Sequence, residues 1–388
     1  MSMTTGDQAM IKRINTAIVL EAILRHAPLS RAKISETTGL NKATVSSLVQ
    51  DLIDNKLVAE TGTGASSGGR KPVMLEFVAD AGYAVGIDLG VNYMRGVLTD
   101  LRGNVVSERM TALTTVDPDR VFGTLRPFIQ QVMDEAPDSP FGIVGIGVGV
   151  PGLVDRNGSV LFAPNMDWRD VPLREALSRT FNLPVMIDNE ANAGALGEQR
   201  FGIGRGISNI VYVSVGIGIG TGLILQSRLY KGSSGFSGEI GHMTIEAGGK
   251  PCRCGNLGCW ELYASEQALL EQAAELGYKD KDLDGLLAAA EAGDESVASL
   301  LKRIGEYLGI GIANIVNVFN PNAVIIAGRL SRARPWLEEA VKDTLERRAL
   351  GFHLRNVNVL YAELGDRSAV MGAVEMAISS FFERLKTS

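Results

Sequence analysis

The placement of cysteine is the feature that most constrains this chain. Cys252, Cys254 and Cys259 all fall within eight positions of the 388-residue sequence, and His242 lies just upstream. Three thiolates and one imidazole form the complete ligand set of a closed tetrahedral Zn2+ site, and the glycines between the cysteines allow a tight fold around one ion. We therefore predict a structural zinc ion bound by these four residues. Three unrelated buried cysteines beside a surface histidine are the alternative.

Composition narrows the class of protein. Charged residues make up 21% of the chain and hydrophobic residues 45%, which fits a soluble, well-packed protein. The longest apolar stretch, residues 142–154, is too short to span a membrane and contains Pro151. The N-terminus is polar and lacks a secretory signal pattern, and cysteines assignable to a metal indicate a reducing compartment. The chain is therefore expected in the cytoplasm, without a membrane partner.

Charge is distributed unevenly along the chain. Residues 1–78 hold nine Lys and Arg against seven Asp and Glu, a balance of +2, whereas the remainder holds 29 against 37, a balance of −8. A mildly basic head on an acidic body indicates that the head is the part that meets nucleic acid.

Residues 10–60 are predicted to form three short helices. Ser30 and Asn41 are N-cap candidates for the second and third helices, and Gly39 ends the second. This is a helix-turn-helix arrangement, in which the third helix enters the major groove. The polar face of that helix is expected to reach phosphates and base edges through Lys42, Thr44, Ser46, Ser47 and Gln50. An ordinary helical bundle with a solvated face is the alternative.

A β-hairpin wing is predicted directly after these helices. Residues 57–60 and 73–77 have the composition of strands, and the segment between them is rich in Gly and Ser and contains Arg70 and Lys71. A tip without bulky side chains can enter a narrow minor groove, where the negative potential attracts arginine. We therefore expect Arg70 and Lys71 to contact DNA, at an operator that is AT-rich. A flexible linker would also be rich in Gly and Ser, but it would not need Arg-Lys-Pro.

From Tyr83 onward the pattern changes to that of an α/β protein. Strands are expected at residues 83–90, 94–100, 104–113 and 142–148, with a helix near 117–135 between the last two. The order βββαβ, with an Asp88-Leu89-Gly90 turn after the first strand, suggests an actin-like nucleotide-binding half. A second half begins near Glu190 and contains a glycine loop at residues 216–222. The fold class is therefore α/β, with a helix over about 366–382 closing the chain.

These motifs together resemble the ROK family of repressors and sugar kinases. The resemblance covers residues 11 to about 377 and is most specific at Gly218-Ile219-Gly220-Thr221-Gly222, at Gly238-Glu239-Ile240-Gly241-His242 and at the cysteine cluster. It implies an actin-like (ribonuclease H-like) two-domain body, in a dimer or tetramer, behind a winged helix-turn-helix. The implied domains are the head at 1–78, domain I at 79–188 plus about 366–388, and domain II at 189–365.

The resemblance also implies a sugar site between the two domains. Its hydroxyl-binding residues would be Asn165, Asn189, Glu190, Glu239, His242 and Glu261. Carboxylates and amides can bind adjacent hydroxyl pairs, and a wrong epimer would leave buried polar groups unpaired. His242 would bind zinc through one ring nitrogen and offer the other to a hydroxyl, so the metal would hold the sugar-binding residues in register. Trp168 and Trp260, which flank these positions, could be core or could stack on the sugar ring.

A sugar kinase is the rival interpretation, because part of this family phosphorylates sugars with ATP. In the first turn, Val91 and Asn92 replace the glycine and threonine of the family's kinases, and Ile217 replaces a threonine of the second loop. Glu190 stands where the kinases have an aspartate base, and one extra methylene can misplace a base by about an angstrom. We therefore expect a protein that is not an enzyme.

The predicted function is a sugar-responsive transcriptional regulator, a repressor of sugar-metabolism genes. The heads of an oligomer would bind palindromic operator DNA, and xylose or another monosaccharide would bind in the body and change the spacing of the heads. A third possibility is a body that binds no sugar and serves a protein partner instead. The set of polar residues expected around the sugar argues against that loss.

Overall fold

The structure is a computed structural model that describes residues 8–63 and 71–387. Its N-terminal part, here called the head, contains three helices and a small sheet in the strand order β1-β3-β2. The elements are α1 (Gln8–His26), β1 (Leu29–Ser30), α2 (Arg31–Thr38), α3 (Lys42–Asp54), β2 (Val58–Thr63) and β3 (Val73–Phe77). The three helices and the β2–β3 hairpin confirm the predicted winged helix-turn-helix.

Local signals in the sequence account for the helix ends in the head. The Ser30 hydroxyl accepts a hydrogen bond from the Lys33 amide, and the Asn41 side chain accepts one from the Thr44 amide at 2.8 Å. Gly39 ends α2 with a left-handed φ of 72°, which glycine adopts without steric cost. The turn between α2 and α3 is therefore specified by residues within it.

The body that follows contains two five-stranded sheets. The first sheet has the order β11-β7-β4-β5-β6, in which β4, β5 and β6 are antiparallel and β7 and β11 run parallel to β4. We call this sheet with its two covering helices the first half. Its elements are β4 (Tyr83–Leu89), β5 (Tyr93–Asp100), β6 (Val105–Ala112), α4 (Pro118–Met133), β7 (Ile143–Val150), α5 (Leu173–Phe181) and β11 (Val185–Asn189). A small sheet that the sequence did not predict lies between β7 and α5, made of β8 (Leu153–Val154), β9 (Val160–Ala163) and β10 (Trp168–Val171).

The second sheet repeats this topology and defines the second half. Its order is β14-β13-β12-β15-β16, again with three antiparallel strands followed by two parallel ones on the other side of the first strand. Its strands are β12 (Ile210–Val215), β13 (Ile219–Leu225), β14 (Arg228–Leu229), β15 (Ala323–Ala327) and β16 (Asn358–Tyr361). Its helices include α7 (Glu261–Ala264), α8 (Glu266–Glu275), α9 (Leu283–Glu291), α10 (Glu295–Phe319), α11 (Arg334–Arg348) and α12 (Gly351–Leu354). The duplicated order confirms the predicted actin-like fold.

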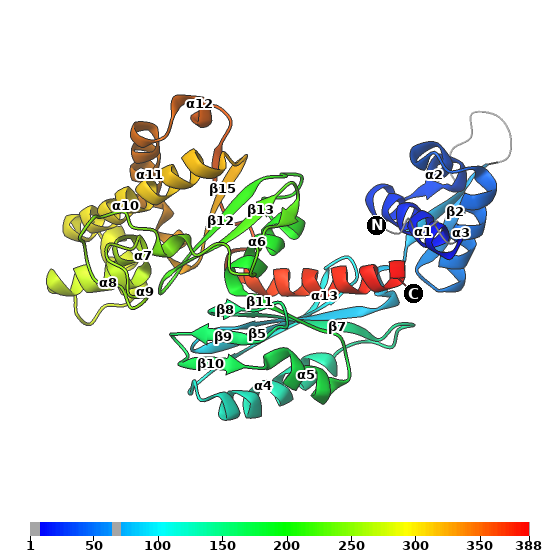
Figure 1. Ribbon diagram of the computed structural model, residues 1–388, viewed down its shortest axis with the longest axis horizontal. Coiled ribbons are helices and arrows are strands. Elements are labelled where there is room, and N and C mark those ends of the chain that lie inside the picture. The colour runs from blue at the N-terminus through cyan, green and yellow to red at the C-terminus, as the bar shows by residue number, and fades with distance from the viewer. Residues whose placement is uncertain (1–7, 64–70, 388) are drawn as a thin grey trace.

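Two helices lie between the sheets and join the halves. They are α6 (Glu190–Phe201), which leads from β11 to β12, and α13 (Ser368–Thr387), which returns from the second half and packs on α6, β7 and β4. Figure 1 shows α13 crossing the first sheet on the face opposite α4 and α5. The contact is close because a Cβ on Gly372 would overlap the Ala193 carbonyl.

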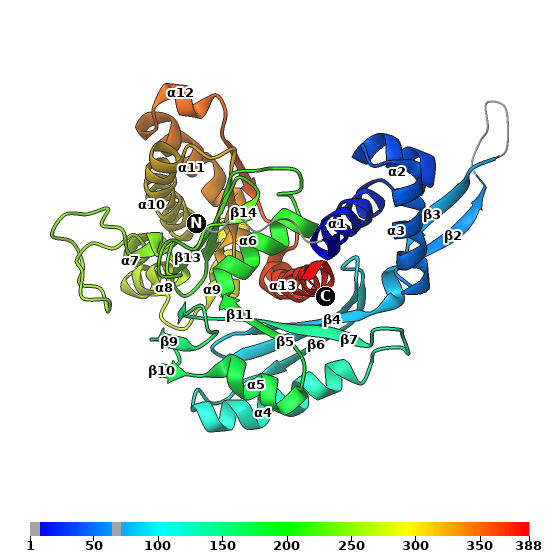
Figure 2. The same cartoon turned by 45° about the vertical axis from the view of Figure 1, so that its right-hand side comes forward.

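The head packs on the C-terminal part of α13. Val19 and Ile23 of α1 share one buried apolar cluster with Ile378 and Phe381, and both views place α1 beside the end of α13 (Figures 1 and 2). The ring centroids of Phe77 and Phe382 are 5.9 Å apart. The core of the head is thus continuous with that of the body. Among the residues described, no helix is long and apolar enough to cross a membrane.

Candidate functional site

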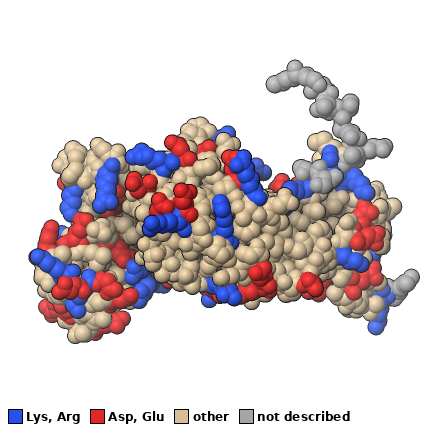
Figure 3. Space-filling model, turned by 90° about the horizontal axis from the view of Figure 1, so that it is seen from below, with Lys and Arg blue, Asp and Glu red and all other residues tan. Residues whose placement is uncertain are grey.

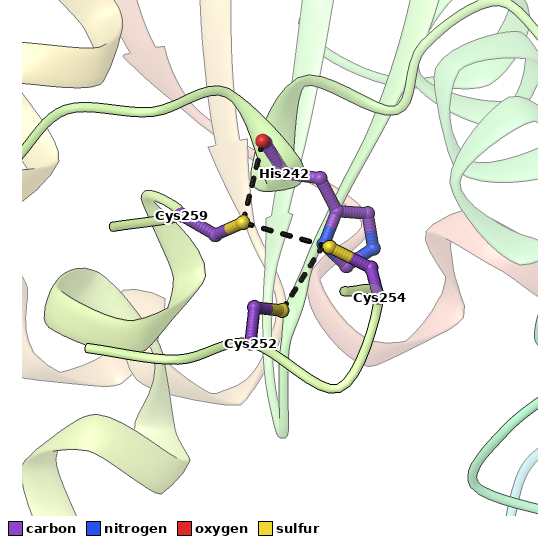
Figure 4. A group of neighbouring side chains, drawn as sticks. All are labelled: His242, Cys252, Cys254 and Cys259. Atoms are coloured by element: carbon purple, nitrogen blue, oxygen red, sulfur yellow. Dashed lines mark hydrogen bonds between the residues drawn. The ribbon is translucent and has the colours of Figure 1, made fainter. Parts of the chain in front are cut away.

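The four residues predicted to bind metal lie together. One ligand atom from each of His242, Cys252, Cys254 and Cys259 lies within 4.8 Å of the others (Figure 4). The Sγ of Cys252 is 3.6 Å from Nδ1 of His242, and the two other sulfurs are 3.7 Å apart. Tetrahedral ligands at zinc distances of about 2.0–2.3 Å would be separated by roughly 3.5–3.8 Å. The cluster has the size and the donor set of a zinc site.

The loop around this cluster is held by its own backbone. Isolated bridges pair Thr244 with Cys259 and Pro251 with Leu257, and the Asn256 side chain donates to the Thr244 hydroxyl at 3.0 Å. Gly258 has a φ of 70°, and a Cβ there would overlap the Glu246 carbonyl. The peptide therefore brings the ligands together through local hydrogen bonds.

Burial disfavours the charged form of two of these thiols. It raises the pKa of Cys252 to about 12 and also raises the pKa of Cys259. The thiolate is the form that binds metal, so a bound cation would act against this shift at Cys252 and Cys259.

Three of the predicted sugar-binding residues adjoin the cluster. His242 directs Nδ1 toward the cysteines and Nε2 toward the Glu239 carboxylate, whose Oε2 is 4.0 Å away. The Oε1 atom of Glu261, the first residue of α7, lies 3.3 Å from His242 Nδ1 and 3.3 Å from the Cys252 sulfur. The structure thus brings Glu239, His242 and Glu261 together in the second half.

Two further predicted residues stand at the start of α6. Asn189 is the N-cap: its side-chain oxygen accepts from the Ala191 amide at 2.8 Å, and its amide group donates to the Gly152 carbonyl at 2.9 Å. Glu190 is the first residue of the helix and is partly buried. The dipole and free amides of a helix N-terminus favour a carboxylate at that position.

Asn165 is carried by the turn between β9 and β10. The residue is exposed. Gly152, which accepts from Asn189, also packs against the end of β9, since a Cβ there would lie 2.7 Å from the Ala163 Cα. Gly152 therefore contacts both Asn189 and Ala163, which lies two residues before Asn165 in the chain.

The glycine-rich segment at the start of β13, with Gly218 just before the strand and Gly220 within it, connects the two groups of residues. A Cβ on Gly218 would lie 2.7 Å from Oε2 of Glu261, and a Cβ on Gly220 would lie 3.1 Å from the Ala191 side chain. The same short segment thus contacts Glu261 on one side and the residue after Glu190 on the other. Across the halves, the Lys231 ammonium group binds the Asp188 carboxylate at 2.8 Å.

Asp88 and Tyr93 lie near Glu190, although neither residue was predicted to belong to the site. Asp88 pairs in register with Gly149 of β7, where a Cβ would lie 3.7 Å from the Glu190 Cα. The Tyr93 hydroxyl donates to Oδ2 of Asp88 at 2.8 Å, while Oδ1 is buried and has no hydrogen-bond partner among the described residues. The position of Asp88 at the end of the first strand could have marked it as a site residue. Its contact with the Glu190 region depends on strand register, which the sequence does not show.

The environment of these two carboxyl groups favours their neutral forms. Burial raises the pKa of Asp88 to about 6, against the opposing effect of the Tyr93 hydrogen bond. Burial also raises the pKa of Glu190 to about 7, and the nearby Asp88 charge adds to the shift. The pair can therefore hold a proton near neutral pH, and a carboxylic acid can donate a hydrogen bond.

Both tryptophans that flank the predicted sugar residues belong to the core. Trp168 and Trp260 have no exposed surface. Their indole N–H groups donate to the carbonyls of Val116 and Tyr307, at 2.6 and 2.9 Å respectively. A ring that is buried on all sides cannot stack on a sugar, so the structure decides in favour of the core role.

The predicted DNA-binding residues lie on the solvent side of α3. Lys42, Ser46, Ser47 and Gln50 are exposed and Thr44 is partly exposed, whereas the opposite stripe of Val45, Leu48, Val49 and Leu52 is buried. Lys71 is exposed at the start of the returning wing strand. Arg70 lies outside the described residues.

Positive and negative side chains are mixed on the face of the molecule that Figure 3 shows. Figure 3 shows acidic and basic side chains interspersed over the second half, at the left, and few charges over the middle of the molecule. Neither region on this face has the continuous basic surface that DNA-binding proteins present.

Comparisons with known proteins cover nearly the whole chain. The ROK family model matches residues 84–380, and a MarR family model matches residues 11–66. The xylose repressor of Bacillus subtilis is 43% identical over 387 residues, which cover 99% of this chain and 100% of that protein. The DNA-binding transcriptional dual regulator NagC of Escherichia coli is 30% identical over 384 residues, covering 95% of each.

Solved structures match this chain either over nearly its full length or over about three quarters of it. A ROK family transcriptional regulator, a homologue of the E. coli MLC protein, matches with a TM-score of 0.86 and 28% identity, over 97% of this chain and 98% of that one. A ROK family glucokinase from Streptomyces griseus, solved with glucose and AMPPNP, matches with a TM-score of 0.66 and 30% identity, over 76% of this chain and 99% of that one. The kinase thus corresponds to about the body alone. Together these matches show that the chain belongs to the ROK family.

Proposed function

We propose that this protein is a repressor that binds operator DNA through its head and a monosaccharide, xylose in particular, through its body. One observation carries the proposal. A single chain joins a helix-turn-helix with an exposed polar recognition face to a body in which amide, carboxylate and imidazole groups gather around a glycine loop. Relatives that are named xylose repressors match over their full length, which supports xylose as the effector.

The sugar site would be formed by Asn165, Asn189, Glu190, Glu239, His242 and Glu261. Asn189 and Glu190 are held by the N-terminus of α6, while His242 and Glu261 are held by the cysteine loop. A ring of sugar hydroxyls needs both donors and acceptors from rigid elements, and these residues supply both. The division into domains at about residues 78, 188 and 365 would place the sugar between the two halves.

Zinc is the metal that suits the cluster, with a structural role. Cys252, Cys254, Cys259 and Nδ1 of His242 would complete a tetrahedral set, which would leave Nε2 of His242 on the side of Glu239. When bound, the ion supplies the positive charge that stabilises the thiolates. The chain itself then orients His242 and Glu261 toward a ligand.

DNA binding would involve a palindromic, AT-rich operator. Residues Lys42, Thr44, Ser46, Ser47 and Gln50 would enter the major groove, and Arg70 and Lys71 of the wing would reach the minor groove. A homodimer or homotetramer in the cytoplasm would present two heads with the two-fold symmetry of such a site. The sugar can alter DNA affinity only by binding one arrangement of the heads better than another.

A kinase fits the first turn less well. A Cβ on Gly90 would overlap the Tyr93 ring, so that ring occupies the space beside the turn, and the Tyr93 hydroxyl holds Asp88. Phosphate binding needs a turn that the phosphate can approach closely. This agrees with the replacements at Val91, Asn92, Ile217 and Glu190.

A thermal-shift series with D-xylose, D-glucose, N-acetyl-D-glucosamine and L-arabinose tests the proposal. A ligand that binds the folded state raises stability by RT ln(1 + [L]/Kd), so D-xylose should raise the melting temperature most. A duplex that the protein selects from random-sequence DNA should then be released or bound more tightly when D-xylose is added. No shift with any of the four sugars would contradict the proposal, as would steady phosphorylation of a sugar with ATP.

A further inference from the structure

The chain passes between the halves of the body twice, and the two passages meet. The first passage is α6, and the second is the segment from β16 to the start of α13, residues 362–367. We call the meeting point the crossing joint and define it as Glu198, Ile203, Glu363, Leu364 and Ser368. These two passages are the covalent links between the halves. A rotation of one half relative to the other must therefore bend the chain at the passages or pivot on them.

The carboxylate of Glu198 holds the crossing joint together. Oε1 accepts from the Leu364 amide at 3.0 Å and from the Ser368 hydroxyl at 2.7 Å. Oε2 accepts from the amides of Ile203 at 3.1 Å and Glu363 at 3.2 Å. Glu198 has no exposed surface. One buried carboxylate therefore satisfies four donors, of which two belong to the second passage and one, the Ser368 hydroxyl, belongs to the first residue of α13.

Glycines bring the backbones of α6 and α13 into contact beside this carboxylate. A Cβ on Gly197 would overlap the Ser368 carbonyl, and one on Gly372 would overlap the Ala193 carbonyl. Tyr212 of β12 reaches the same place, because its hydroxyl would lie 2.6 Å from a Cβ on Gly194. The backbones of the two helices are therefore in direct, close-packed contact at this point, so a shift of one helix must displace the other.

The far end of α6 lies at the proposed sugar site, and the far end of α13 lies against the apolar core of the head. Asn189 and Glu190 form the N-terminal end of α6. At the other end of α13, Phe381 and Phe382 belong to the apolar cluster of the head, and α1 contacts the helix. In Figure 1 α13 runs from beside α6 to the head. A displacement at the start of α6 has a continuous, packed route to α1.

We propose that the crossing joint transmits sugar binding to the head, with Glu198 as the residue that couples α6 to α13. The inference rests on the proposed function, since it concerns how occupancy of the sugar site changes DNA affinity. Glu198 touches neither ligand and is a positioning residue. Its carboxylate makes the two helices one mechanical unit, so movement of Glu190 with the sugar also moves the surface on which the head packs.

Glu198→Gln is the decisive variant, because it keeps the shape and changes the hydrogen-bonding capacity. An amide offers one oxygen and one NH2 group, so the amides of Ile203 and Glu363 would face a donor in place of an acceptor. Ser368→Ala is a milder variant that removes one of the four bonds. Glu266→Gln is the matched control, because Glu266 is also a buried carboxylate, bound to Arg329 at 3.1 Å, and it belongs to α8 and to neither passage.

The experiment measures D-xylose affinity, and operator affinity with and without saturating D-xylose, on the full-length proteins. Allosteric coupling typically changes affinity about 5- to 150-fold. We expect wild type and Glu266→Gln to show the same ratio of operator affinities. Glu198→Gln should bind D-xylose and DNA within about threefold of wild type yet bring the ratio close to one, and Ser368→Ala should give an intermediate ratio.

Each outcome decides a separate point. A folded Glu198→Gln protein with the wild-type ratio would overturn the inference, as would an equal loss in Glu266→Gln, which would indicate general destabilisation. If Glu198→Gln does not fold, the ratio in Ser368→Ala decides, and a wild-type ratio there overturns the inference. A wild-type protein that binds DNA but does not respond to D-xylose, D-glucose, N-acetyl-D-glucosamine or L-arabinose would overturn the proposed function itself.

Discussion

Gly218 lies directly against Glu261: a Cβ at position 218 would be 2.7 Å from the Oε2 atom of the glutamate. The glycine loop and the cysteine loop therefore meet at one carboxylate. Position 218 therefore requires glycine whether or not a phosphate binds nearby. A larger residue would occupy the space of the Glu261 side chain, which we expect to bind sugar.

Gly218→Ala should therefore displace Glu261 and weaken sugar binding. A methyl group inside van der Waals distance forces the carboxylate to move, and the loss of one well-placed charged hydrogen bond corresponds to roughly tenfold to hundredfold in Kd. Titration calorimetry with D-xylose measures it. Gly216→Ala is the control, because a Cβ there has nothing within 4 Å. Equal affinities in the two variants would exclude Glu261 from the site.

Glu239→Ala should remove the sugar response while DNA binding persists. The residue stands 4.0 Å from Nε2 of His242, on the side away from the cysteines, so its loss takes an acceptor from the ligand without touching the cluster. Operator binding is measured by fluorescence anisotropy with and without D-xylose. Glu246→Ala, an exposed carboxylate of the same loop, should respond normally. A normal response from Glu239→Ala would remove Glu239 from the site.

Removal of zinc should loosen residues 238–262 and abolish sugar binding. Without the ion the buried thiols revert to their neutral forms, and the loop loses the bond that orients His242. Metal analysis of the purified protein should find one zinc per chain, and hydrogen exchange should increase in this segment after chelation. Cys254→Ser should behave as the chelated protein does. Purified protein without zinc that still binds sugar would contradict the assignment.

Arg70→Ala and Lys42→Ala should weaken operator binding and leave sugar affinity unchanged. Each lost phosphate contact should reduce the slope of log affinity against log salt concentration by about one. Lys33→Ala provides the control, since that exposed lysine lies on α2 and pairs with Glu36 at 3.0 Å. An Arg70→Ala protein with unchanged operator affinity would rule out the wing as a DNA contact.

The contribution of Asp88 and Glu190 to the free energy of unfolding should fall as the pH rises from about 4 to about 7. Burial raises the folded-state pKa of Asp88 to about 6 and that of Glu190 to about 7, so the folded protein holds protons that the unfolded chain has released. This favours folding below the unfolded pKa values of about 4 and is lost above the folded values. In Asp88→Asn, the loss in free energy of unfolding across this pH window should be smaller by about 2–3 kcal/mol. Urea unfolding at several pH values measures it, and an unchanged loss would contradict the burial argument.

Much of the head and the metal cluster could be predicted from sequence because their specificity is local. The caps Ser30 and Asn41 bind amides three residues away, and the ligand spacing of Cys252, Cys254 and Cys259 is written directly in the chain. The division of α3 into an apolar and a polar face follows from helical periodicity alone. Each of these features is specified by residues that are close in the sequence, so it can be predicted without knowing how the chain packs.

The sequence by itself determined the helix-turn-helix, the βββαβ order of the first half and the grouping of His242 with the three cysteines, whereas β14 and β16 of the second sheet were not predicted. Only the tertiary structure decided that both tryptophans are core, that Asp88 adjoins Glu190, and that Glu198 binds residues about 165 positions away. Such pairs depend on the register of strands and on the crossing of α6 with α13. Their energy arises only when segments remote in the chain pack together, so residue patterns alone could not place these side chains beside one another.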